Sequence, residues 1–146
     1  MSIKAPPPPK SIGPYRVVKQ LGQGGMGVVY EAVHEGISRR VAIKVLRSEY
    51  SHNSEVAQRF FNEARAANVI EHPALVQISE FGQLPEGATY LVMELLKGEN
   101  LASRLRRGGA LPLPVVLRIA CQLAEALCAA HEKNIVHREQ LMSSVL

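Results

Sequence analysis

A glycine-rich stretch at residues 21–30, with the sequence LGQGGMGVVY, most constrains the fold of this chain. Gly22, Gly24 and Gly27 follow the spacing G-x-G-x-x-G, and glycine lets backbone N–H groups approach a phosphate chain closely. The flanking segments 15–21 and 28–34 are rich in β-branched and apolar residues, which predicts two strands of a hairpin. Because the spacing alone is weak evidence of binding, the residues that follow must decide what this loop does.

A third predicted strand, residues 40–46, contains the sequence Val41-Ala42-Ile43-Lys44. Alternation along a strand places Ala42 and Lys44 on one face and the β-branched residues on the other. Beside a small alanine a flat ring can approach the sheet, and the Lys44 ammonium group can reach phosphate oxygens. The alternative is an exposed lysine on an edge strand.

Residues 54–70 are predicted to form a helix, since Val56, Phe60, Ala64 and Ala67 recur at helical spacing. Glu63 lies within this apolar stripe, where an unpaired carboxylate would be costly. We expect Lys44 to be its partner. The alternative is a glutamate at the edge of the stripe that reaches water.

Further along the chain, residues 74–81 and 89–95 are predicted strands, 101–107 a short helix and 114–133 a long helix with an apolar stripe. Residues 1–13 contain four consecutive prolines and are predicted to be a disordered leader. The expected fold class is therefore α+β, with a five-stranded antiparallel sheet and one helix in residues 14–96. Residues 97–146 supply a hinge and the first helices of a second region.

The chain of 146 residues has a formal net charge of +4, with a small basic cluster at Arg104, Arg106 and Arg107. No aromatic platform accompanies this cluster, so we expect a solvated helix face and no nucleic-acid partner. No unbroken run of about 18 apolar residues occurs, which predicts a soluble, cytoplasmic protein without a membrane partner. Cys121 and Cys128, seven residues apart, are expected to be small core residues, and metal-ligand spacing is absent.

Together these landmarks resemble the eukaryotic-like, bacterial-type serine/threonine protein kinases from about residue 15 to residue 146. The shared motifs are the glycine loop, V-A-I-K, the helix glutamate, His72-Pro73 and residues 91–94, LVME. A glycine loop inside a hairpin excludes the dinucleotide-binding fold, in which the loop joins a strand to a helix.

The resemblance implies ATP and Mg²⁺ as cofactors and assigns roles to residues of this chain. Lys44 would hold the α and β phosphates while paired to Glu63, and Met93 would be the gatekeeper. The backbone of Glu94 and of Leu96 would meet the adenine edge, and Glu99 or Asn100 is an open candidate for the ribose. The residues expected to enclose the nucleotide are Leu21, Gly22, Gln23, Gly24, Gly25, Met26, Gly27, Val28, Val29 and Ala42.

The end of the chain departs from the family pattern. The catalytic loop H-R-D-x-x-x-x-N reads HREQLMSSVL here, so Glu139 stands at the aspartate position and Ser144 at the metal-binding asparagine position. A carboxylate displaced by about 1 Å can cost about 10²-fold in rate. The D-F-G segment, which holds the principal metal ligand, is absent, so no metal site is complete and this chain alone is predicted to be inactive.

Three functions remain open from the sequence. The first is a truncated member of the kinase family that binds ATP and, by family, acts on protein hydroxyls. The second is a pseudokinase-type docking module for a partner kinase, and the third is a non-functional remnant.

Overall fold

The computed structural model describes residues 8–24, 27–47, 50, 54–70 and 72–135, with the backbone alone at residues 54, 59, 63, 66 and 67. The chain divides into two compact units. Residues 1–64 and 77–95 form the first, which we call the sheet unit. Residues 65–76 and 96–146 form the second, which we call the helical unit.

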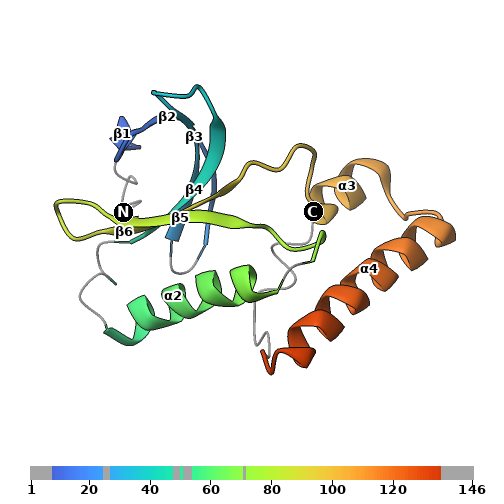
Figure 1. The fold of residues 1–146 in the computed structure, drawn as a ribbon. Coiled ribbons are helices and arrows are strands. Elements are labelled where there is room, and N and C mark those ends of the chain that lie inside the picture. The colour runs from blue at the N-terminus through green and yellow to red at the C-terminus, as the bar shows by residue number, and fades with distance from the viewer. Residues whose placement is uncertain (1–7, 25–26, 48–49, 51–53, 71, 136–146) are drawn as a thin grey trace, which may run out of the picture. The chain divides into compact units, whose positions relative to one another are not determined.

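The sheet unit contains a six-stranded antiparallel sheet with the order β1-β2-β3-β4-β6-β5. Its strands are β1 (Ser11–Ile12), β2 (Tyr15–Gln23), β3 (Gly27–His34), β4 (Arg40–Leu46), β5 (Ile78–Gln83) and β6 (Thr89–Glu94). Helix α2 (Ser54–Val69) lies along the sheet in Figure 1. The predicted α+β class and the hairpin around the glycine loop are confirmed.

The sheet has one strand more than predicted, because β1 lies inside the segment expected to be a disordered leader. Gly13 adopts a φ of +53°, a left-handed conformation that glycine adopts readily, and turns the chain back before Pro14. Ile12 pairs with Tyr15 and is fully buried in the core. A two-residue strand after four prolines carries no periodic signal, so only its tertiary contacts reveal it.

One face of the sheet, which we call the Tyr90 face, carries the larger apolar core. Its buried members are Ile12, Tyr15, Tyr30, Ala32, Val41, Ile43, Tyr90 and Val92. The Tyr90 ring lies so close to β5 that a Cβ added at Gly82 would be 2.4 Å from its Cζ atom. The Tyr15 hydroxyl donates a hydrogen bond of 2.6 Å to Glu80 Oε2, which links β2 to β5 across this face.

The opposite face, which we call the Lys44 face, packs against α2. Phe60 and Ala64 of α2 form a second buried cluster with Leu46 and Leu91 of the sheet. Burying a phenylalanine or leucine side chain contributes about 1.5–3 kcal/mol. The predicted helical stripe is thus confirmed at Phe60 and Ala64, and it anchors the helix to the sheet.

The helical unit contains α3 (Leu101–Gly108) and α4 (Leu113–Glu132). Asn100 caps the start of α3, and the Gly109 N–H closes its end with a bond of 2.8 Å to the Leu105 carbonyl. Pro112 is the N-cap residue of α4, and Pro114 lies in its first turn, where the missing N–H of proline costs no helical hydrogen bond.

Helix α4 is largely exposed within the described structure. Its buried residues are Ala126 and Ala130, whereas Cys121 and Cys128 are exposed, so the expectation that both cysteines are core residues is wrong. By length and composition alone α4 could cross a membrane, a test that core helices of soluble proteins also pass. The apolar run of α4 is not continuous, because Arg118 and Glu125 interrupt it.

Candidate functional site

The register of the sheet brings four of the predicted site residues to one face. Val29 of β3 lies opposite Lys44 of β4, and Ala42 lies opposite Met93 of β6. Residues directly opposite each other in antiparallel strands share a face, as do alternate residues along one strand. Val29, Ala42, Lys44 and Met93 therefore all lie on the Lys44 face, and the predicted shared face of Ala42 and Lys44 is confirmed.

Lys44 lies where the open part of this face meets helix α2. Its side chain is half-buried, and its Nζ atom lies 5.5 Å from the centroid of the Phe60 ring. A cation over an aromatic face is attracted by the ring quadrupole. Its register partner on the other side is Leu91. Strand β4 lies between β3 and β6 in the sheet, so the alternative of an exposed lysine on an edge strand is wrong.

The glycine loop is a tight turn between β2 and β3, and Gly25 and Met26 lie outside the described residues. The Gly24 N–H donates a hydrogen bond of 2.9 Å to the Gly27 carbonyl, and the Arg47 guanidinium donates one of 3.2 Å to the Gly24 carbonyl. A Cβ at Gly27 would lie 2.6 Å from the Val45 carbonyl oxygen, so this position requires glycine.

The other loop residues are placed differently. Gly22 lies opposite Val29, and a Cβ added to Gly22 would meet open space. Leu21 lies at a register shift and is exposed. Gln23 pairs with Val28, which packs against the core of the Tyr90 face, so their side chains are not brought to the Lys44 face.

The predicted hinge begins where β6 ends. Met93 packs against the Phe60 cluster, in keeping with a position between α2 and Ala42. The Glu94 carboxylate accepts a hydrogen bond of 3.1 Å from the Gln77 N–H, and the Glu94 N–H donates one of 3.3 Å to the Gln77 carbonyl. Leu96 is exposed and belongs to the helical unit, so the adenine contacts of Glu94 and Leu96 stay a prediction.

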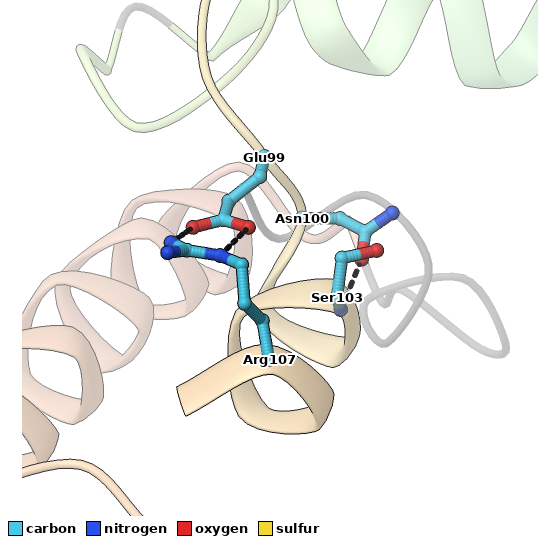
Figure 2. Close-up of polar contacts among 4 residues, drawn as sticks. All are labelled: Glu99, Asn100, Ser103 and Arg107. Carbon is cyan, nitrogen blue, oxygen red and sulfur yellow. Dashed lines mark hydrogen bonds and ion pairs between the residues drawn. The ribbon is translucent and has the colours of Figure 1, made fainter. Parts of the chain in front are cut away.

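The two candidates for the ribose both have structural partners, as Figure 2 shows. Asn100 Oδ1 accepts a hydrogen bond of 2.8 Å from the Ser103 N–H at the start of α3. Glu99 pairs with Arg107, whose guanidinium holds the pKa of the carboxyl below its ordinary value. Asn100 therefore caps the first turn of α3, whereas Glu99 contacts its last turn through Arg107.

Several catalytic candidates lie outside what the structure describes. The Glu63 side chain is one, although its backbone is part of α2, so the Lys44–Glu63 pair stays a prediction. Glu139 and Ser144 are outside altogether.

Glu31 is a buried carboxylate on the Lys44 face that the sequence analysis did not single out. It lies opposite Ala42 and is 3% exposed. Hydrogen bonding from Arg40 holds the pKa of its carboxyl below the ordinary value, although burial acts in the opposite direction. The sequence feature that could have revealed Glu31 is its position between Tyr30 and Ala32, in the middle of a largely apolar strand.

Comparison with known proteins identifies the family of this chain. A family model described as the protein kinase domain matches residues 15–140. The chain belongs to the protein kinase family. The serine/threonine-protein kinase PknA of Mycobacterium tuberculosis is 42% identical over 138 residues, which cover 92% of this chain and 32% of PknA. Pkn2 of Myxococcus xanthus, also a serine/threonine-protein kinase, is 43% identical over 129 residues, which cover 87% of this chain and 15% of Pkn2.

A crystal structure of the PknI kinase domain of M. tuberculosis is similar in fold, with a TM-score of 0.72 and 30% sequence identity. The match covers 91% of this chain and 55% of that domain. The chain thus spans about a third of the length of PknA and just over half of a solved kinase domain.

Protein kinases use ATP and Mg²⁺, and the two fit this chain differently. For ATP, the small Ala42, the cation of Lys44 and the open space at Gly22 lie on or beside one face. For Mg²⁺, no group of three or more acidic, histidine or cysteine side chains occurs within the described residues. The D-F-G aspartate is also missing from these 146 residues. The described residues therefore do not form a Mg²⁺ site, and Glu139 and Ser144 lie outside them.

Proposed function

We propose that the sheet unit is an ATP-binding lobe of serine/threonine kinase type and that this chain alone does not transfer phosphate. The observation that carries the proposal is the register that places Val29, Ala42 and Lys44 on one face. Ala42 leaves room for a flat base, and the Lys44 ammonium offsets the charge of phosphate oxygens. The glycine loop presents backbone N–H groups beside them.

Inactivity follows from the missing chemistry. Phosphoryl transfer requires positioning and charge neutralisation, for which the family uses its catalytic-loop aspartate and the D-F-G aspartate. Glu139 replaces the first, and the second is absent from these 146 residues. We therefore infer that the chain binds the nucleotide without using its γ-phosphate.

The test is the melting temperature of the chain with and without ATP and Mg²⁺. A ligand at 100 times its Kd stabilises the folded state by about 2.7 kcal/mol, so a clear upward shift is expected. Lys44→Ala should abolish most of this shift, whereas Lys133→Ala, a matched change in the helical unit, should leave it intact.

Absence of a shift in the parent chain would refute nucleotide binding. Transfer of labelled phosphate to a generic protein substrate, above the level of the Lys44→Ala variant, would refute inactivity.

A second candidate function is a docking module, and the exposure of α4 favours it. Leu113 and Leu117 are 68% and 55% exposed, and Val115 and Val116 between them are exposed as well. Contiguous exposed apolar surface of this kind marks interaction sites. Pull-down with the parent chain and a Leu117→Asp variant tests this. A monodisperse monomer that retains no partner in either form would contradict docking.

A further inference from the structure

Three charged residues from three neighbouring strands meet on the Lys44 face, and we call them the charge triad. Lys19 of β2 lies with its Nζ atom 3.6 Å from Glu31 Oε2, and Arg40 of β4 pairs with Glu31 Oε1. The Glu31 side chain is only 4% exposed, whereas those of Lys19 and Arg40 are each 63% exposed. A buried carboxylate is therefore held between two partly exposed cations.

The charge triad coincides with a β-bulge in the first strand of the glycine hairpin. Val17 pairs with Ala32, but the next pair along the strands is Lys19 with Glu31. Strand β2 therefore contains one extra residue at this point. Alternation would place Lys19 on the same face as Val17. The bulge moves it to the Lys44 face, where it meets Glu31.

The part of β2 that leads into the glycine loop has little apolar burial to hold it. Every residue from Val18 to Gln23 is exposed. The ladder to β3 is interrupted a second time between Gln20 and Gly22. At the far end of the hairpin, Arg47 bonds to the Gly24 carbonyl. Side-chain contacts thus tie the hairpin near its middle, at Lys19 and Glu31, and at its tip, at Gly24.

We propose that Glu31 is a positioning residue that sets the height of the glycine loop over Lys44. Through Lys19 it holds β2 at the bulge, and through Arg40 it ties this strand pair to β4, which carries Ala42 and Lys44. The inference rests on the proposed nucleotide binding and deepens it. It assigns Glu31 to the recognition of the phosphate chain, although no contact with the nucleotide is required of it.

This role can be tested by comparing ATP with adenosine, because both contain the base but only ATP carries the phosphate chain. The glycine loop contacts phosphates, whereas Ala42 faces the base. Loss of the tether should therefore weaken the binding of ATP much more than the binding of adenosine, and a small effect on adenosine is expected because Glu31 also lies opposite Ala42. A residue that served only the stability of the sheet would alter both affinities in the same proportion or neither.

The experiment is isothermal titration of the full chain with ATP plus Mg²⁺ and, separately, with adenosine. Glu31→Gln, which keeps the size and removes the charge, should weaken ATP binding by about fivefold, the upper range for an ion pair with an exposed partner. Glu35→Gln, an exposed glutamate just after the same hairpin, is the matched control and should change neither affinity.

Lys19→Gln provides a second test that leaves the Glu31–Arg40 pair in place and should also lower the affinity for ATP much more than that for adenosine. Its control is Lys10→Gln, which is exposed near β1. Unchanged ATP binding in Glu31→Gln or Lys19→Gln would overturn the role, and so would a parallel loss of adenosine binding. A parent chain that binds neither ligand refutes the proposed function itself, before any variant is compared.

Discussion

The sheet unit and the helical unit bury their apolar residues to very different extents. Ile43, Phe60 and Val92 of the sheet unit are fully buried, and two apolar clusters cover both faces of the sheet. In α4 the buried residues are two alanines, and α3 has none. The difference indicates that the sheet unit contains its own core. Helix α3 is held by the Asn100 cap and the Glu99–Arg107 ion pair, whereas α4 has no side-chain cap and leaves much of its apolar side exposed.

The largest expected effect comes from substituting one large apolar residue in each unit and comparing the losses of stability. Phe60→Ala should lower the free energy of unfolding by about 3–5 kcal/mol, because it leaves a cavity under α2. Leu117→Ala, at an exposed position of α4, should change it by less than about 0.5 kcal/mol. Urea unfolding followed by circular dichroism measures both values.

Equal losses in the two variants would contradict the comparison, since they would mean that the exposed side of α4 is covered in solution.

The stability of the chain at alkaline pH tests the environment of Tyr15 in the core of the Tyr90 face. Burial, and next the hydrogen bond to Glu80, raise the pKa of Tyr15 to about 12 from 10.0. A folded-state pKa above the unfolded value means that the stabilisation is complete below pH 10 and is lost as the pH rises through 12. Between these values the parent chain should lose stability more steeply than Tyr15→Phe.

Below pH 10, Tyr15→Phe should be less stable than the parent by about 1.5 kcal/mol, because a hydrogen bond to a charged group is removed. Thermal melts of both chains between pH 8 and pH 12 would test this. Parallel curves would show that folding does not raise the pKa of Tyr15, and equal stability below pH 10 would show that the hydroxyl does not bond Glu80.

A smaller and more local effect is expected from the cap of α3. Asn100→Ala should destabilise this helix by about 1 kcal/mol, because the Ser103 N–H loses its acceptor. Hydrogen exchange should become faster in α3 and stay unchanged in β3 and β4. Asn100→Asp retains an acceptor and serves as the control. A loss of protection that extends into the sheet would show that the two units are energetically coupled.

Local patterns predicted most of the sheet unit. Alternation in β4 correctly placed Ala42 with Lys44, and helical periodicity correctly placed Phe60 and Ala64. Each of these two patterns involves residues that are close together in the chain, so the sequence alone reveals it. The predicted strand from residue 74 begins only at Ile78, because Leu75 first closes a turn onto the His72 carbonyl after the helix.

The features that the sequence did not reveal depend on contacts between distant strands. Ile12 is buried through tertiary packing, and the partners of Glu31 come from β2 and β4. The bulge that turns Lys19 toward Glu31 has no sequence signature of its own. The exposure of Cys121 and Cys128 was missed because the apolar face of a helix predicts burial only when a second surface covers it.

The hydrogen bond between Tyr15 and Glu80 has a consequence for the order of folding. It joins residues 65 positions apart, whereas β2, β3 and β4 pair with their neighbours through short turns. The entropy of loop closure rises with length, so contacts between sequence neighbours form at lower cost. The meander of β2, β3 and β4 should therefore assemble early, and the curl that brings β2 to β5 should be a late event.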